Sequence, residues 1–281
     1  MGPFESMTHV SIYTTICTIV LLYITTKKDP IRIAYTFVMN LIRSPRYLLH
    51  FGALVLILLM NNLELWVEKF IHNKTDFTLI FYSIEKEFVA NIQHFFLNDT
   101  LTYVTSFFYV IVFSTLMIVS IALYTWNKNY QLFNALCYAI IINYVVAMPF
   151  YLFFQVNEVW VLNPNVNMLI SNVFPTFEQT YREMSGINNC FPSLHTSLSI
   201  TMAVIATHSG NAFWKWFTRI TAGIIIFSIF YLGIHWFLDM GAGLILGVAA
   251  SKYGLKIAQG RQSFKLPARV NTPMKQRSLS D

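Results

Sequence analysis

The chain alternates long apolar runs with short polar connections. Stretches of about 20 apolar residues are long enough to cross the hydrocarbon of a bilayer as α-helices, and the pattern predicts about seven of them. They cover approximately residues 8–26, 47–67, 102–125, 132–155, 193–209, 213–236 and 239–256. The fifth and seventh are short and contain polar residues, which is typical of helices that line a protein-enclosed site. The sequence therefore predicts an all-α integral membrane protein.

Two further segments are amphipathic rather than spanning. Residues 31–42 and 79–96 mix apolar side chains with charged ones, so we expect helices that lie in the membrane interface. For the second segment, packing on the outer mouth of the bundle is an equal alternative. Its acidic residues, Glu85 and Glu87, are assigned to a solvated helix face.

The same pattern divides the chain into three regions. Residues 1–100 hold transmembrane and interfacial helices, and residues 101–257 form a core of transmembrane helices. Residues 258–281 are polar and basic with two prolines, a composition that predicts a disordered tail.

Composition supports the membrane interpretation. The chain is 56% hydrophobic and only 11% charged, whereas an ordinary soluble domain carries about 25% charged residues. The net charge of +6 would suit nucleic acid, but the charges follow the membrane topology, so we expect the bilayer as the partner and no nucleic acid. The three cysteines are too few and too scattered for a disulfide framework.

The basic residues orient the predicted helices. With the N-terminus outside the cytoplasm, 15 of the 19 Lys and Arg residues fall on the cytoplasmic side, where the positive-inside rule places them. The other four are Lys69, Lys74, Lys86 and Arg182. This topology brings His195, His235 and Asp239 to the extracytoplasmic face and leaves the tail in the cytoplasm. In a bacterial or archaeal source, the membrane would be the plasma membrane.

The first element that carries chemistry is the segment 188–195, which reads NNCFPSLH. Pro192 suits the first turn of a helix, where its missing N–H has no cost. Ser193 and His195 would then lie near a helix N-terminus, where free N–H groups and the helix dipole favour an anion. A histidine placed there is able to protonate a leaving oxygen.

The second element joins His235 to Asp239. Their spacing puts both side chains on one helical face or brings them close across a short turn. A carboxylate beside a histidine fixes its tautomer and makes the other nitrogen a better nucleophile or base. Gly241 and Gly243 should allow the following helix to pack closely on its neighbours.

Together these elements resemble a known family. The motif Phe-Pro-Ser-Leu-His, followed some 40 residues later by Ser-x6-His-x3-Asp, is similar to the motifs of the type 2 phosphatidic acid phosphatase superfamily. Leu194 and Ile229 replace residues typical of the phosphatases and resemble the branch of inositol phosphorylceramide synthases. The resemblance covers about residues 140–255 and implies that the core has the helical fold of that superfamily.

One departure concerns the phosphate clamp. The family's first motif, a Lys followed by an Arg-Pro pair, is absent, and the loop 156–190 has a single basic residue, Arg182. We therefore expect phosphate to be bound by Arg182 and Ser193, with Asn188 and Asn189 as further candidates.

The resemblance also implies a mechanism. His235, oriented by Asp239, would attack phosphorus and form a phosphohistidine, while His195 protonates the departing oxygen. No metal and no cofactor are expected, because histidines and helix dipoles carry the charge. Water as the second acceptor gives a lipid phosphatase and another alcohol gives a phosphotransferase. The substrate would be a phospholipid or lipid phosphate, and the sequence does not predict the oligomeric state.

Two other functions compete with this one. A polytopic transporter or channel would carry ionisable residues deep in its spans, but here such residues lie almost entirely near the ends. An intramembrane serine protease would need a Gly-x-Ser-Gly element beside its histidine, and none occurs in the sequence.

Overall fold

The computed structural model describes residues 6–71, 75–181 and 185–260, and in this part of the chain nearly all regular structure is helical. Two strands of two residues each, β1 (Thr75–Asp76) and β2 (Phe154–Gln155), pair in parallel. The helical membrane fold predicted from the sequence is thus confirmed. The tail prediction concerns mainly residues 261–281, which lie outside the described residues.

The elements of the first half are α1 (Met7–Thr26), α2 (Pro30–Arg43), α3 (Pro45–Glu68), α4 (Thr78–Glu85), α5 (Phe88–Phe96), α6 (Asp99–Phe107), the π-helix η1 (Phe108–Val112) and α7 (Phe113–Trp126). Those of the second half are α8 (Tyr130–Phe153), α9 (Val159–Leu162), the 3-10 helix η2 (Leu169–Asn172), α10 (Phe177–Tyr181), α11 (Leu194–Ala206), α12 (Ala212–Tyr231) and α13 (Phe237–Gly260).

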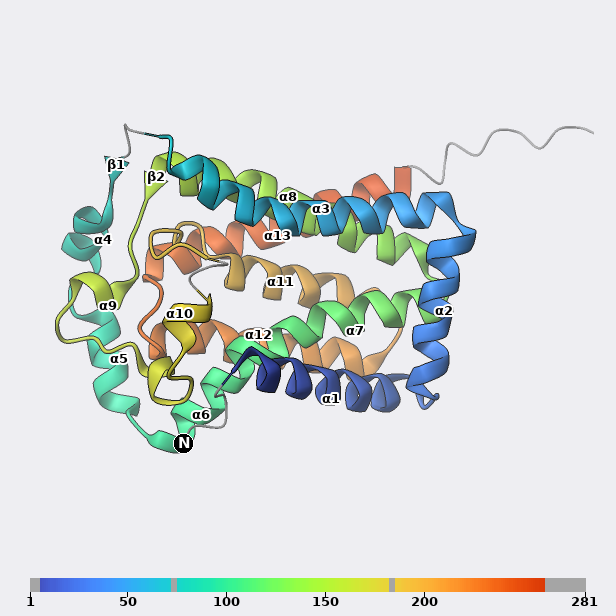
Figure 1. Ribbon diagram of the computed structural model, residues 1–281, viewed down its shortest axis with the longest axis horizontal. Coiled ribbons are helices and arrows are strands. Elements are labelled where there is room, and N and C mark those ends of the chain that lie inside the picture. The colour runs from blue at the N-terminus through green and yellow to red at the C-terminus, as the bar shows by residue number, and fades with distance from the viewer. Residues whose placement is uncertain (1–5, 72–74, 182–184, 261–281) are drawn as a thin grey trace, which may run out of the picture.

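The long helices form one bundle. In Figure 1, α1, α3, α7, α8, α11, α12 and α13 run along the long axis, α2 crosses one end, and α4, α5, α9 and α10 lie at the other. Helix α3 packs on α8, and α1 packs on α7. The N-terminal helices are therefore built into the same bundle as the core.

Length and hydropathy qualify four helical stretches as membrane spans, namely Met7–Thr26, Asp99–Trp126, Tyr130–Phe153 and Ala212–Tyr231. A fifth candidate is the pair Pro30–Arg43 and Pro45–Met60, which is bent by 105°. Helix α11 is apolar but has only 13 residues, and α13 is not among the helices whose length and hydropathy suit a membrane span. The count of seven spans consequently remains a prediction.

The bend between α2 and α3 follows from the local sequence. The side chains of Asp29 and Ser44 accept hydrogen bonds from backbone N–H groups of α2 and α3, and a proline occupies the first position of each helix. Asp and Ser are favoured N-caps, and proline suits the first turn. Helix α2 lies across the end of the bundle with Ile31 and Ile42 exposed, consistent with a helix in the interface.

The second amphipathic segment differs from the prediction. It is not one helix over 79–96 but two, α4 and α5, because Lys86 has a positive φ of 49° and ends α4. The break turns Glu85 and Glu87 toward different partners, and one of these belongs to the candidate site.

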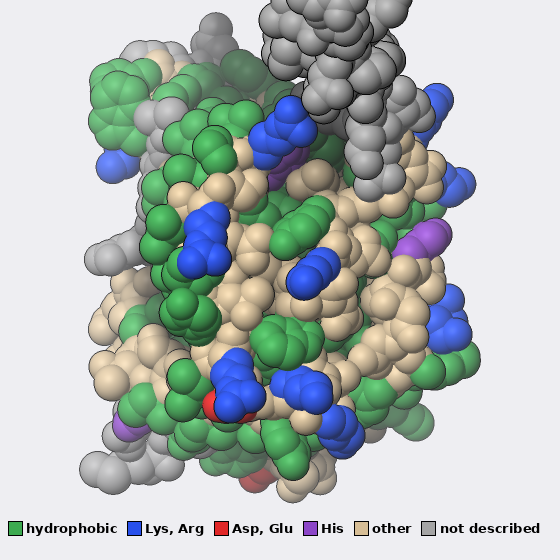
Figure 2. Space-filling model, turned by 90° about the vertical axis from the view of Figure 1, so that its right-hand side faces the viewer, with side chains coloured by type: hydrophobic (Ala, Val, Ile, Leu, Met, Phe, Trp, Pro, Cys, Tyr) green, Lys and Arg blue, Asp and Glu red, His purple; other side chains and the backbone are tan. Residues whose placement is uncertain are grey.

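Basic side chains gather at the end that carries α2. Figure 2 shows Lys and Arg spread over this face, which the chain reaches between α1 and α2, between α7 and α8, and at the start of α12. The polar connections around α4, α9 and α10 lie at the opposite end (Figure 1). Lys and Arg are thus present at the end where the topology places the basic connections, while the side of the membrane that each end faces stays a prediction.

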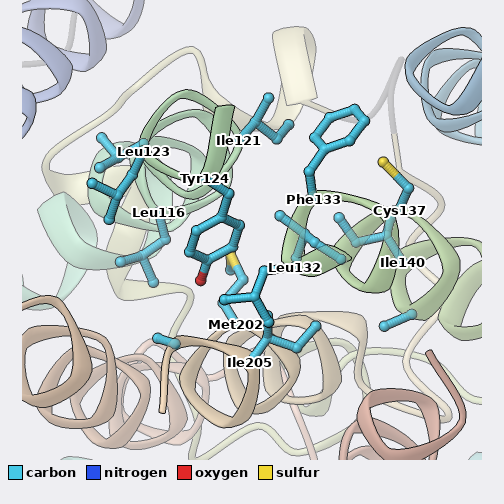
Figure 3. Packing of buried hydrophobic residues seen from close by; sticks show 14 of the residues in the cluster. Leu116, Ile121, Leu123, Tyr124, Leu132, Phe133, Cys137, Ile140, Met202 and Ile205 are labelled. Atoms are coloured by element: carbon cyan, nitrogen blue, oxygen red, sulfur yellow. The ribbon is translucent and has the colours of Figure 1, made fainter. Parts of the chain in front are cut away.

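The centre of the bundle is a packed apolar core. Figure 3 shows side chains of α7, α8 and α11 meeting there, among them Leu116, Tyr124, Phe133 and Ile205. Glycines let α13 approach α11, since a Cβ on Gly243 would lie 2.6 Å from the carbonyl oxygen of Ser193. Gly241 has open space instead, so only Gly243 of the predicted pair serves close packing.

Candidate functional site

The first part of the site is the start of α11. Ser193 is its N-cap, and the Ser193 hydroxyl accepts a hydrogen bond from the Thr196 N–H at 3.3 Å. Pro192 precedes this cap instead of occupying the first turn, which corrects the sequence prediction. The Tyr151 hydroxyl donates to the Pro192 carbonyl at 2.9 Å. These two bonds hold the segment that leads into His195.

Aromatic rings fix the side chain of His195. Its ring stacks on Tyr109 at a centroid distance of 4.1 Å and lies against Phe113 at 4.6 Å. Tyr109 belongs to the π-helix η1, and such wide turns often occur at functional sites because they re-aim side chains. The Nε2 atom of His195 is buried and has no hydrogen-bond partner among the described residues, so it is available to a ligand.

The second part is the connection between α12 and α13. Helix α12 ends at Tyr231, and the chain turns at Gly233, whose φ is +80° and where a Cβ would lie 2.6 Å from the Asn167 carbonyl oxygen. His235 lies in this connection, and Asp239 lies in the first turn of α13. The pair is therefore joined across a short turn, one of the two arrangements that the spacing allowed.

The Asp239 carboxylate holds the loop and orients the imidazole. Its Oδ2 atom lies 3.3 Å from His235 Nδ1 and accepts the Trp236 N–H at 2.9 Å. With a proton on Nδ1 directed at the carboxylate, the Nε2 atom of His235 keeps its lone pair. That nitrogen is then the nucleophilic or basic atom of the pair.

The two histidines face one another across a cavity. Their ring centroids are 6.3 Å apart, and both line a cavity of about 400 Å³. This volume is near the lower end of the range for ligand pockets, which is about 300–1,000 Å³. The structure thus brings together the three residues that the sequence placed on one face, and their catalytic roles stay predictions.

The N-terminal region also forms part of the cavity. Met7 and Val10 of α1 and Leu58 of α3 line it, as does Tyr144 of α8. The sequence assigned no functional role to residues 1–100, because apolar side chains carry no signal for a ligand. Met7 at the start of α1 lies on the same cavity as His195, so the N-terminus of α1 is at the site end of the bundle.

The predicted phosphate ligands take several different positions. Arg182 lies outside the described residues. The Asn188 amide donates to Glu68 at 2.7 Å, and the Asn189 amide donates to Glu64 at 3.0 Å. Only Asn189 of these two lines the cavity.

These asparagine contacts bear on phosphate binding. In each amide one N–H is directed to a carboxylate from α3, so a phosphate would compete with an acceptor that is already charged. None of the described residues that line the cavity is Lys or Arg. The start of α11 offers another donor set, since Leu194 and His195 line the cavity at the helix N-terminus.

Glu85 has a place in the site that the sequence did not indicate. Its carboxylate accepts hydrogen bonds from the Phe237 N–H at 2.6 Å and the Leu238 N–H at 2.7 Å. Burial raises the pKa of Glu85, while the two backbone bonds act in the opposite direction. The predicted solvated face is therefore wrong for Glu85, which caps α13 from a distant part of the chain.

Glu87 differs from Glu85 in its partners, which include side-chain amides. Its carboxylate accepts hydrogen bonds from the side-chain amides of Asn165 and Asn163, which lower the pKa of Glu87. No local sequence signal distinguishes the two acids, because their partners lie about 80 and 150 positions away along the chain.

A third side chain lies beside His235 and Asp239. Cys190, His235 and Asp239 each offer one atom able to bind a metal ion, and these atoms all lie within 4.8 Å of one another. All three residues are buried. The sequence predicted no metal ligands, and Cys190 was considered only for disulfides.

Comparisons with known proteins found similarity to one family and to a solved structure. The family model described as PAP2 superfamily matches residues 82–253. Among solved structures, the crystal structure of LpxE from Aquifex aeolicus is similar over 60% of this chain and 93% of its own, with 21% sequence identity and a TM-score of 0.47. A comparison with curated proteins gave no match.

Proposed function

Because the chain belongs to the PAP2 superfamily, we propose that it is a membrane-embedded enzyme that cleaves a phosphate ester bond of a lipid. The observation that supports this most is the pair of histidines on one cavity, with His235 held by Asp239. Two imidazoles on opposite sides of a phosphate are able to act as nucleophile and proton donor in one reaction.

The proposed reaction has two steps. In the first, His235 Nε2 attacks phosphorus, the bond from phosphorus to the lipid oxygen breaks, and the His195 ring gives a proton to that oxygen. In the second, His195 takes a proton from water or an alcohol as its oxygen attacks phosphorus. The phosphorus–nitrogen bond breaks, and His235 is restored. Asp239 stabilises the positive charge that the His235 ring carries in the phosphohistidine.

The phosphate oxygens need donors beside the histidines. We assign them to the backbone N–H groups of Leu194 and His195 at the start of α11, where the helix dipole favours an anion. Arg182 is the proposed cation of the clamp. Ser193 would act mainly by holding this helix end, since its hydroxyl caps α11, and Asn188 and Asn189 would act mainly by fixing the loop before it.

The second acceptor decides between hydrolysis and transfer. Leu194 and Ile229 are similar to residues of the inositol phosphorylceramide synthase branch, which transfers head groups to an alcohol, and these two positions favour transfer. The basic end of the bundle favours a cytoplasmic location for α2 and an extracytoplasmic one for the cavity.

The test uses the purified full chain in lipid vesicles. A panel of lipid phosphates and phosphodiesters, with and without candidate alcohols, is incubated with the protein, and products are identified by mass spectrometry. We expect His235→Ala and His195→Ala each to abolish phosphate release or transfer, and His208→Ala, an exposed histidine beyond the far end of α11, to retain it. Full activity in either of the first two variants would contradict the proposal.

A further inference from the structure

We propose that Cys190, His235 and Asp239 form a binding site for a soft divalent cation, represented by Zn²⁺, and that the bound cation inhibits the enzyme. The inhibitory effect rests on the proposed function, because two of the ligands are its catalytic pair. The binding itself follows from the geometry of the three residues.

Cys190 is held against the loop that carries His235. Its thiol donates to the Ile234 carbonyl at 3.6 Å, and its backbone N–H donates to the Val156 carbonyl at 3.3 Å. One ligand atom from each of the three residues lies within 4.8 Å of the other two. Thiolate, imidazole and carboxylate are ligands that Zn²⁺ binds in proteins.

The distances suit a tetrahedral ion after a small adjustment. Zinc bond lengths of about 2.0–2.3 Å place neighbouring ligand atoms roughly 3.3–3.5 Å apart. His235 Nδ1 and Asp239 Oδ2 are already separated by 3.3 Å. The ligand atoms all lie within 4.8 Å of one another, so the Cys190 sulfur has to approach by at most about 1.3–1.5 Å to complete three ligands. The fourth position is left for water or a substrate oxygen.

A second observation points to a cation here. The other carboxylate oxygen of Asp239, Oδ1, is buried and has no hydrogen-bond partner among the described residues. Asp239 itself is fully buried. A buried carboxylate oxygen without a partner is costly, and a cation bound beside it would remove that cost.

The cation would compete with catalysis through His235. The cation replaces the proton between His235 Nδ1 and the Asp239 carboxylate. It also neutralises the negative charge of Asp239, which the proposed reaction needs to stabilise the His235 ring. The Cys190 thiol loses its proton on binding. His195 is not among the ligands, so its ring is unchanged. The expected result is an enzyme that binds the metal tightly and turns over slowly.

The binding test uses Co²⁺, whose thiolate complexes absorb strongly in the near ultraviolet. The full chain, without an affinity tag, is treated with a chelator and titrated with Co²⁺. We expect a thiolate band in the wild type, in His195→Ala and in Cys17→Ser, a cysteine on α1 outside the cavity. We expect the band to be lost in Cys190→Ser and His235→Ala. Its absence from the wild type, or its persistence in Cys190→Ser, would overturn the site.

The inhibition test measures phosphate release at increasing Zn²⁺, with each variant compared with its own metal-free rate. Removing a ligand of this kind is expected to raise the half-inhibitory concentration about tenfold or more in Cys190→Ser, while Cys17→Ser follows the wild type. Equal inhibition of Cys190→Ser would overturn the proposal. If the metal-free wild type neither releases phosphate nor transfers it to an alcohol, the proposed function fails and the Co²⁺ result still decides the site. If Cys190→Ser does not fold, the presence or absence of the Co²⁺–thiolate band in the wild type decides whether the site exists.

Discussion

The N-terminal ends of α11 and α13 lie side by side, since the Ser193 N–H donates to the Asp239 carbonyl, but they are capped in different ways. The end of α11 is capped by its own Ser193, and Leu194 and His195 behind this cap line the cavity. The end of α13 is closed by Glu85, which comes from α4 and accepts the first two N–H groups of the helix. A helix N-terminus attracts anions, and that of α13 already binds the Glu85 carboxylate.

This difference separates the two tasks of the site. In the proposed reaction, helix α11 offers the N–H groups of its first turn to the phosphate and supplies His195. In helix α13 the first two N–H groups are directed to Glu85, and the helix contributes Asp239, whose carboxylate lies beside the His235 ring. Substitutions at one helix end or at its supports therefore test whether the other end is affected.

The largest effect is expected from Asp239→Asn. The amide keeps the shape of the side chain, but it has no negative charge and favours the wrong tautomer of His235. We expect the rate of phosphate release to fall by about 10³–10⁴-fold, as for other carboxylate–histidine pairs. Single-turnover kinetics with a lipid phosphate would measure this. Asp99→Asn is the matched control, an exposed acid in the first turn of α6. A rate within tenfold of the wild type in Asp239→Asn would contradict the assigned role.

A smaller effect is expected when the closed end of α13 is opened. Glu85→Ala removes the acceptor of two N–H groups, so the loop with His235 loses a support. We expect a stability loss of about 1–2 kcal/mol and a decrease in kcat of about 10- to 100-fold from misplacement. Glu85→Gln, which keeps one acceptor oxygen, should recover part of both.

Glu87→Gln controls for this change, because Glu87 contacts the Asn163 and Asn165 amides and not α13. Thermal unfolding and steady-state kinetics are measured on all three variants. If Glu87→Gln lowers kcat as much as Glu85→Ala, the cap on α13 is not the cause, and the contrast between the two helix ends loses its functional meaning.

The sequence predicted the local parts of this arrangement and missed the tertiary ones. His195 beside Ser193, and His235 four positions before Asp239, are close in sequence, so spacing and helix geometry were enough to place each group. The topology then brought both groups to one end. The role of Glu85 depends on a contact 152 positions away, and that of Cys190 on the path of a loop. Neither leaves a periodic signal.

The predicted end of the helix over 213–236 was wrong for a related reason. The run 213–236 stays apolar past Tyr231, through Leu232 and Ile234, so hydropathy gave no sign that α12 ends at Tyr231. The turn at Gly233 has a φ of +80° and lies against the Asn167 carbonyl oxygen, 2.6 Å from where a Cβ would be, so only glycine fits there. Likewise, the apolar residues of α1 and α3 that line the cavity are identical in type to those that face lipid.

A further prediction concerns the support of His195. Tyr109→Leu removes the ring stacked on the imidazole and leaves a side chain of apolar character. An aromatic pair contributes about 0.5–1.5 kcal/mol beyond its burial, so we expect kcat to fall about 3- to 10-fold, with KM changed less. Tyr109→Phe keeps the ring and should stay near the wild type. The pH–rate profile is the distinguishing measurement, because a freed imidazole should shift the limb due to His195. An unchanged profile and rate in Tyr109→Leu would show that the stack does not position the acid.

The smallest effect on the reaction rate is expected from a change in the packing that sets the ends of α11 and α13 side by side. The Ser193 N–H donates to the Asp239 carbonyl at 3.1 Å, and a Cβ on Gly243 would lie 2.6 Å from the Ser193 carbonyl oxygen. Gly243→Ala must push α13 away from α11, at a cost of about 1–3 kcal/mol typical of overpacking.

Gly241→Ala provides the matched comparison, since nothing lies within 4 Å of its Cβ position and alanine favours a helix by up to about 1 kcal/mol. Thermal unfolding in detergent should therefore give opposite signs, a lower midpoint for Gly243→Ala and an equal or higher one for Gly241→Ala. Because the displacement acts on both helix ends together, Gly243→Ala should also lower kcat a few-fold without changing the pH–rate profile that Tyr109→Leu alters. Equal midpoints for the two variants would mean that α11 and α13 have room to separate at no cost, and that their close approach does not set the geometry of the site.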